Sequence, residues 1–147
     1  MAVNVGQRNV PDTNANRKSD AVDKCQHLCR HVLNLTANSK VLECPHADVA
    51  QRVRDLATDA YLLVFAANRI DTRTKDRKTL AERVENQNVA MTDLVMMQGL
   101  IPVAVSCFKW RRGKKEYWTK LTREAIDIVK AWHESDLDTF GSVIKGV

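Results

Sequence analysis

Residues 47–69 read ADVAQRVRDLATDAYLLVFAANR, and this stretch decides the fold. Its apolar residues recur at alternating spacings of four and three, the heptad pattern of a helix that packs along a seam. The seam consists of Val49, Val53, Leu56, Ala60, Leu63 and Ala67. Four further apolar residues widen it near its end: Tyr61, Leu62, Val64 and Phe65. The wide face predicts contact with more than one neighbour, either within one bundle or in another subunit.

Three other segments have the same helical period, at about residues 20–35, 77–108 and 115–134. Ser19 and Asp20 supply N-cap chemistry for the first of them. Its predicted buried stripe is Val22, Cys25, Leu28, Cys29, Val32 and Leu33. The long helix presents Leu80, Val84, Met91, Leu94, Val95, Ile101 and Val105, and the last helix presents Trp118, Leu121, Ala125, Ile128, Val129 and Trp132.

Two residues disturb the pattern of the long helix. Gln87 interrupts its apolar stripe, and Pro102 falls inside it. Because proline lacks the backbone donor and clashes with the preceding turn, a kink or break is predicted near Leu100.

Four amphipathic helices with short connections predict an all-α, up-down-up-down four-helix bundle over residues 19–135. No segment alternates with period two, and only five glycines and three prolines occur, which disfavours a turn-rich β-sandwich. Residues 1–18 are polar and lack a period, so they predict a flexible N-terminal tail. Residues 136–147 contain two glycines and predict a loose C-terminal tail.

The chain of 147 residues has the length of one domain. It begins with polar residues rather than an apolar leader, and no apolar stretch is expected to reach the length of a membrane span. The four cysteines are therefore interpreted as reduced thiols in a cytoplasmic protein without a membrane partner.

The first third of the chain contains six cysteines and histidines of the types that ligate metals. They are Cys25, Cys29, Cys44, His27, His31 and His46. Structural zinc takes four such ligands, but the spacing here matches no standard zinc pattern. Cys25 and Cys29 lie on the apolar stripe, where cysteine behaves as a small hydrophobic residue. No metal or other cofactor is expected.

Catalytic patterns are also weak. The chain has no nucleophile elbow, no protease signature and no glycine-rich phosphate loop. Asp55 and Asp59 fall on a helix exterior, and Glu82, Glu85 and Asp93 do not share one helical face. A non-enzyme is predicted; a metal-dependent hydrolase would require bound metal.

Basic residues form two clusters, one at each of the last two helix connections. The first consists of Arg69, Arg73, Lys75, Arg77, Lys78 and Arg83, and the second of Lys109, Arg111, Arg112, Lys114, Lys115, Lys120 and Arg123. Consecutive connections lie at opposite ends of an up-down bundle, so both poles are expected to be basic. With a net charge of +5, such poles suit a nucleic acid, held through its phosphates and shape rather than through base reading. The alternative is a pair of solvated, charged loops.

Tryptophans divide into two kinds. Trp118 and Trp132 lie on one stripe and are interpreted as core residues. Trp110 lies among cations in a connector, where its ring could stack on a base, and it joins the nucleic-acid-binding candidates.

The run over residues 67–136, about half of the chain, resembles the accessory variability determinant (Avd) proteins of diversity-generating retroelements. The resembling features are Ala67-Asn68-Arg69 closing a helix, Arg77 and the long helix through Gln87 and Ala90, Lys114-Lys115-Glu116-Tyr117-Trp118 opening the last helix, and Trp132 with Ser135-Asp136 closing it. The chain is more distantly similar to the bundle proteins encoded in ribosomal-RNA intervening sequences.

The resemblance implies a four-helix bundle that assembles into a ring-like homopentamer. It implies partnership with the element's reverse transcriptase and with template RNA and its complementary DNA. Such a protein would be non-catalytic and would support mutagenic retrohoming, with the basic residues above facing the RNA. The alternative hypothesis is an oligomeric interaction module without nucleic-acid binding, whose interfaces would lie at residues 61–65 and around Ile126.

Overall fold

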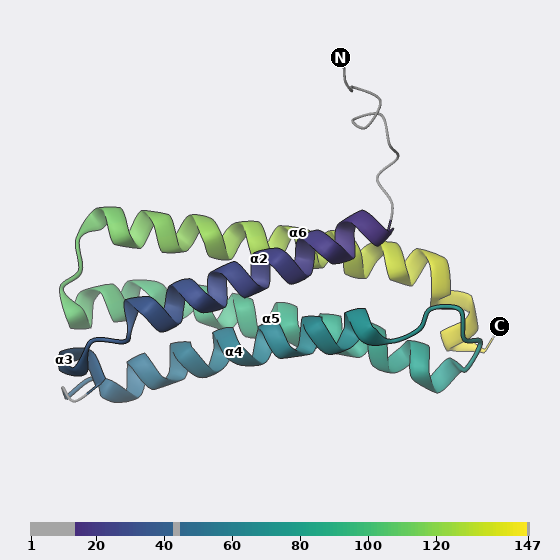
Figure 1. Ribbon diagram of the computed structural model, residues 1–147, viewed down its shortest axis with the longest axis horizontal. Helices are drawn as coiled ribbons and strands as arrows, with labels where there is room; N and C mark the ends of the chain where they lie inside the picture. Colours follow the sequence, from purple (N-terminus) through teal and green to yellow (C-terminus); the bar gives the residue numbers. More distant parts are fainter. Residues whose placement is uncertain (1–13, 43–44, 147) are drawn as a thin grey trace, which may run out of the picture.

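The computed structural model describes residues 14–42 and 45–146, and the first thirteen residues of the predicted tail lie outside this range. Within this range, five helices follow one another: α2 (Asn14–Leu35), α3 (Ser39–Leu42), α4 (Ala47–Arg69), α5 (Arg77–Phe108) and α6 (Arg112–Lys145). The four long helices run alternately up and down (Figure 1), and the described residues contain no strand. The predicted all-α, up-down-up-down bundle is confirmed.

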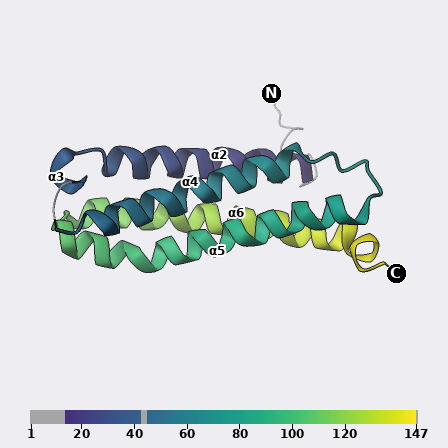
Figure 2. The same cartoon turned by 90° about the horizontal axis from the view of Figure 1, so that it is seen from below.

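Each long helix packs against two others. α2 contacts α4 and α6, and α5 also contacts α4 and α6, so the helices form a closed square around one core. Figure 2 shows the two layers of this square, α2 with α4 and α5 with α6. The bounds predicted for α4 and α5 are confirmed, whereas α2 begins at Asn14, which places Ser19 and Asp20 inside the helix rather than at its cap.

The buried seam of α5 differs from the predicted stripe. It consists of Leu80, Arg83, Gln87, Ala90, Leu94, Met97, Ile101 and Ala104, spaced alternately by three and four. Val95 is 50% exposed and Val84 is only half-buried, so their predicted inward positions are wrong, whereas half-buried Met91 packs against the core as predicted. Small and polar residues complete the heptad register, namely Arg83, Gln87, Ala90 and Ala104. A pattern of large apolar side chains alone does not include them.

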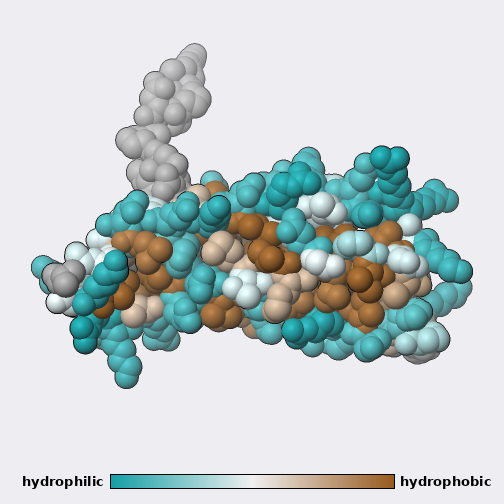
Figure 3. Space-filling model, turned by 180° about the vertical axis from the view of Figure 1, so that it is seen from behind, coloured by the Kyte–Doolittle hydropathy of each residue, from teal (hydrophilic) through white to brown (hydrophobic). Residues whose placement is uncertain are grey.

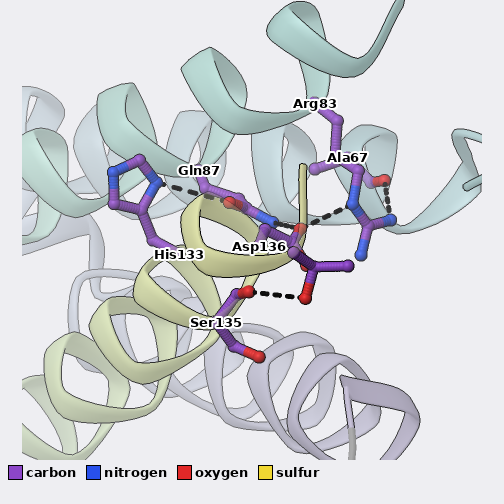
Figure 4. Close-up of polar contacts among 7 residues, drawn as sticks. Ala67, Arg83, Gln87, His133, Ser135 and Asp136 are labelled. Atoms are coloured by element: carbon purple, nitrogen blue, oxygen red, sulfur yellow. Dashed lines mark hydrogen bonds and ion pairs between the residues drawn. The ribbon is translucent and has the colours of Figure 1, made fainter. Parts of the chain in front are cut away.

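Polar side chains form a buried network between α5 and α6 (Figure 4). Arg83 Nε donates to Asp136 Oδ2 at 2.6 Å, and Gln87 Nε2 donates to the same oxygen at 2.6 Å. Arg83 Nη1 donates to the carbonyl oxygen of Ala67 at 3.0 Å, which ties in α4. The guanidinium also lies over the Trp132 ring, 5.0 Å from its centroid. Charges removed from water need such partners, and here one carboxylate oxygen connects two helices.

The predicted loose C-terminal tail is wrong. Residues 136–145 continue α6, and Asp136 is fully buried against Arg83. The helix ends at Lys145, and Gly146 caps it with a left-handed φ of 76°, a conformation that suits glycine. The prediction that Arg83 belongs to the first basic cluster is also wrong, because its side chain is 1% exposed in this ion pair and cannot face RNA.

Pro102 does not break α5, which continues to Phe108. The proline is exposed, on the side of the helix away from the core. Water can there satisfy the carbonyl that loses its partner, so the helix continues past the missing hydrogen bond.

α5 is more apolar than the sequence analysis anticipated. It contains an 18-residue window of mean hydropathy 1.5, which is long and apolar enough to cross a membrane, and only 28% of that window is buried. The expectation that no apolar stretch approaches this length is therefore wrong. A core helix of a soluble bundle passes the same test of length and composition.

Replacing Asp136 by alanine should destabilise the bundle, because Arg83 would keep its charge in a buried position without a partner. Removing one member of a buried ion pair costs about 3–5 kcal/mol of unfolding free energy. Urea denaturation measures the loss. Exposed Asp138, two residues further along α6, is the matched control, and its alanine variant should change by no more than about 0.5 kcal/mol. Equal stability of the two variants would contradict a structural role for the pair.

Candidate nucleic-acid interface

The two basic clusters lie at opposite ends of the bundle, as predicted. The α4–α5 connection lies at the end where the chain terminates, and the α5–α6 connection lies at the end that carries α3 (Figure 1). The predicted cations at both ends are exposed, apart from the buried Arg83. The sequence therefore located two basic poles. They differ in the carboxylates and helix ends that lie beside their cations.

Carboxylates accompany the cations of the α4–α5 end. Residues 69–78 contain five cations and two aspartates. Arg73 donates to both oxygens of Asp71, at 3.0 and 3.1 Å, and this hydrogen bonding lowers the pKa of Asp71. Asp76 accepts a hydrogen bond from the Thr79 hydroxyl, which lowers the pKa of Asp76. Both carboxylates are thus held in the charged form, which reduces the positive potential of this end.

Arg77 has a structural neighbour at the same end. A side chain added at Gly146 would meet Arg77 Nη1 at 2.6 Å, so the guanidinium lies against the C-terminus of α6. The last carbonyls of a helix carry partial negative charge, which a cation stabilises. Arg77 is therefore explained by the end of α6 without a nucleic acid.

The α5–α6 end is more strongly positive. Residues 109–123 contain seven cations and one carboxylate, Glu116. Within the described residues, Arg112 is the one member of this cluster with an ion pair: its Nε lies 3.6 Å from Glu116 Oε2, and both side chains are well exposed. Exposed pairs of this kind contribute little, so most of the positive charge of this end is not neutralised.

A tight connection concentrates these cations at a helix N-terminus. Lys109 adopts the left-handed conformation, with φ 55°, and only three residues separate α5 from α6. The first turn of α6 contains no acidic residue, although Arg112, Lys114 and Lys115 all lie in or next to it. Cations at this position oppose the helix dipole, whereas a bound anion would be favoured by it.

A groove of about 770 Å³, which we call the α5–α6 groove, lies beside this connection. Its lining consists of Val105, Trp110, Arg112, Lys115, Glu116, Thr119, Lys120 and Arg123. The four cations span roughly 16 Å of α6, at 1.5 Å per residue. The structure thus brings five of the predicted residues together, while Lys109, Arg111 and Lys114 lie outside the lining.

Trp110 is half-buried and belongs to an aromatic cluster at the same end. Its ring centroid lies 5.0 Å from that of Phe108 and 6.2 Å from that of Trp118. Trp118 and Trp132 are fully buried, which confirms their interpretation as core residues. Trp110 thus combines contact with the core and a place in the groove wall.

A second surface lies along the outer side of the bundle. Figure 3 shows apolar residues gathered along the middle of the side that α5 and α6 form. Val95 is 50% exposed, and Met96, Val89 and Val103 on the same helix are also exposed. Leu62 and Phe65 on α4 are exposed too, in agreement with the wide apolar face expected for residues 61–65. The exposed residues of α5 were missed, although the near absence of charge from residue 89 to residue 108 was a signal for them.

Two grooves flank α5 on this side. Between α4 and α5, a groove of about 440 Å³ is lined by Asp59, Leu62, Leu63, Val89 and Asp93. Burial, together with the charge of Asp59, raises the pKa of Asp93. A second groove, which we call the Lys130 groove, lies midway along α5 on its other flank. It has a volume of about 410 Å³ and is lined by Met91, Thr92, Val95, Met96, Ile126 and Lys130. One groove is therefore acidic and the other carries a cation.

None of the cysteines among the described residues lines any of the three grooves. Cys25 and Cys29 are buried, and within residues 14–42 and 45–146 no three His, Cys, Asp or Glu side chains gather as metal ligands would. Burial, with a smaller contribution from Cys29, raises the pKa of the Cys25 thiol to about 12. Cys44 lies outside the described residues.

No protein-family model matches the chain, and no match was found among curated proteins or among solved structures. The Avd-like assignment therefore stays a prediction.

Cys25 should resist alkylation in the folded protein. Its thiol is buried and stays protonated at pH 8, whereas Cys107 is half-exposed. Thiolate is the reactive form, so brief iodoacetamide treatment should modify Cys107 well before Cys25. Peptide mass spectrometry gives the order, and treatment in urea provides the control in which both react. Faster labelling of Cys25 in the native protein would contradict its buried position.

Proposed function

We propose that this chain is a non-catalytic, RNA-binding accessory protein of a retroelement reverse transcriptase and supports mutagenic retrohoming. The observation that carries the RNA-binding part is the α5–α6 groove, where four cations and one carboxylate line a cavity beside a helix N-terminus. Phosphates would neutralise these cations and release counterions. The α4–α5 cluster would contribute less, because Asp71 and Asp76 accompany it.

The mode of binding follows from the lining. Lysine and arginine side chains contact phosphates without regard to sequence, and the groove lining contains no asparagine or glutamine, the residues that read adenine. Affinity would therefore be electrostatic. Four phosphate contacts on a single strand give a slope of log affinity against log salt of about −3, or about a 50-fold loss between about 50 and 200 mM salt. RNA is the expected ligand, and complementary DNA would bind through the same phosphates.

The polymerase partner rests on the resemblance over residues 67–136. The proposal places the protein in the cytoplasm, where it would bring template RNA to the reverse transcriptase. Co-purification with a reverse transcriptase encoded beside it tests this part. If the protein binds RNA but never associates with such a polymerase, the assignment of RNA binding to the groove stands and the retroelement role is refuted.

We also propose self-association along α5. The second half of α5 exposes apolar side chains at Val89, Val95, Met96 and Val103, and the bundle covers mainly the inner side of the helix. The flanking grooves carry opposite charge, two aspartates on one side and Lys130 on the other. Joining the acidic groove of one copy to the Lys130 groove of the next is a heterologous contact, which generates a ring when the rotation between copies closes and a filament when it does not. This favours a cyclic homo-oligomer, in line with the pentamer that the resemblance implies.

The alternative function is an oligomeric interaction module without nucleic-acid binding. The exposed apolar surface of α4 and α5 favours it, since it needs no polyanion. RNA binding separates the two functions.

Replacing Arg112 and Arg123 together by glutamate should abolish most RNA binding. Each lost phosphate contact lowers the salt slope by about 1, so the slope should fall by about 2 and the affinity by at least about tenfold. Fluorescence anisotropy at several salt concentrations measures both. The matched control changes Lys75 and Lys78 to glutamate at the opposite end and should retain most of the affinity. Equal losses in both variants would contradict the assignment to the α5–α6 groove, and wild-type protein without RNA affinity would contradict the whole proposal.

Replacing Val95 by aspartate should dissociate the oligomer, because a charge would enter the apolar contact. The exposed control is Leu137, which has a similar exposed fraction, 43% against 50%, but lies near the end of α6. Light scattering coupled to size-exclusion chromatography should give a smaller mass for the Val95 variant and an unchanged mass for Leu137→Asp. A wild-type monomer at all concentrations would contradict self-association.

A further inference from the structure

We propose that the groove binds single-stranded RNA and that an unpaired base stacks on Trp110 after displacing the Lys114 side chain. The inference rests on the proposed RNA-binding function and adds the class of RNA. Three observations support it: the position of the indole, its rigidity and the side chain that covers it.

Trp110 is the accessible tryptophan of the three in the chain. Trp118 and Trp132 are fully buried, whereas Trp110 is half-buried and lines the groove with Arg112, Lys115, Lys120 and Arg123. A flat aromatic side chain beside a row of cations is the arrangement by which proteins hold single strands, since the cations follow the backbone and the ring receives a base.

The indole is held in place before any ligand binds. Phe108 and Trp118 fix it through ring contacts of 5.0 and 6.2 Å, and Trp118 belongs to the core. A ligand that stacks on a fixed ring avoids the entropy loss of ordering it. The core contacts of Trp110 thus support a stacking role rather than compete with it.

Lys114 provides a removable cover. Its Nζ lies over the Trp110 ring, 5.8 Å from the centroid, and within the described residues this ammonium has no ion pair. An exposed cation–π contact is worth about two- to fivefold in an equilibrium constant, whereas stacking of a base contributes about 5- to 150-fold. Exchange of the ammonium for a base is therefore favourable, and the displaced Lys114 is free to pair with a neighbouring phosphate.

Stacking selects single strands over duplexes. In a duplex, both faces of each internal base are covered by its neighbours, so the ring could meet only a terminal pair. An unpaired base in a strand or loop has an open face. A duplex would keep the phosphate contacts and lose the contact with Trp110.

Intrinsic tryptophan fluorescence tests the inference in the full chain, because the two other tryptophans are buried. The probes are a short oligouridine strand and a blunt RNA duplex of the same length, each titrated at fixed salt. We expect quenching by the single strand and little change with the duplex. Trp110→Leu should weaken binding of the strand by about 5- to 150-fold while leaving duplex binding within about twofold, and Trp110→Phe should retain most of the affinity.

Three outcomes would overturn the inference. Equal affinities for strand and duplex with no effect of Trp110→Leu would leave the groove as a phosphate site without stacking. An equal loss for both ligands would give Trp110 a purely structural role. If Trp110→Leu fails to fold, as urea denaturation would reveal, fluorescence of the wild type decides alone, and absence of quenching by a bound strand refutes stacking. Absence of binding to either ligand would instead refute the proposed function itself.

Discussion

The ion pair between Arg83 and Asp136 is the constraint on which the arrangement of the bundle depends. Burying both charges costs several kcal/mol per ion, so the structure is stable only when the two side chains meet in good geometry. That requirement sets the register of α6 against α5, and the hydrogen bond from Arg83 to Ala67 adds α4. Apolar seams alone tolerate sliding by a heptad, whereas a single buried carboxylate with two donors does not. Because the register is fixed at this end, the position at which α6 begins beside the end of α5 is fixed at the other end, and the groove lies there.

Local stability rules are broken where that groove forms. Helix N-termini favour acidic residues, yet the first turn of α6 is basic, and Lys109 adopts a left-handed conformation that glycine would adopt with less strain. The first turn of α5 is basic as well, with Arg77 and Lys78, but Asp76 precedes it, Asp71 is paired with Arg73, and Arg77 lies against the C-terminus of α6. The cations that begin α6 have one exposed carboxylate among them, and an anionic ligand supplies a reason for that arrangement. The two basic clusters look equivalent in the sequence and differ in how their charges are partnered.

The sequence was sufficient for the architecture because helical periodicity reports burial of large side chains. It predicted the bounds of α4 and α5 and the core positions of Trp118 and Trp132. It failed where burial involves polar or small residues. The pattern of large apolar residues predicts an interruption at Gln87 and a surface position for Arg83, although both occupy heptad positions. Asp136 was assigned to a loose tail because its partner is 53 residues distant in the chain, and no local pattern reveals a long-range ion pair. The candidate site was predicted as a set of residues; its depth, and the division between groove lining and exterior, depend on how α5 meets α6.

The two proposed surfaces share α5, and this has a consequence for binding strength. Four cations form a modest site, with an affinity that salt would reduce steeply. The exposed apolar residues of α5 run from Val89 to Val103, while the α5–α6 groove lies beyond them, at the C-terminal end of the helix. In a cyclic assembly every subunit points the same way along the symmetry axis, so association through the sides of the bundles would repeat the groove around one rim. A flexible strand that occupies one groove would then meet its neighbours at high effective concentration, which multiplies weak contacts without any new chemistry. Self-association through α5 would in this way convert a small basic groove into an extended binding surface for a long single strand.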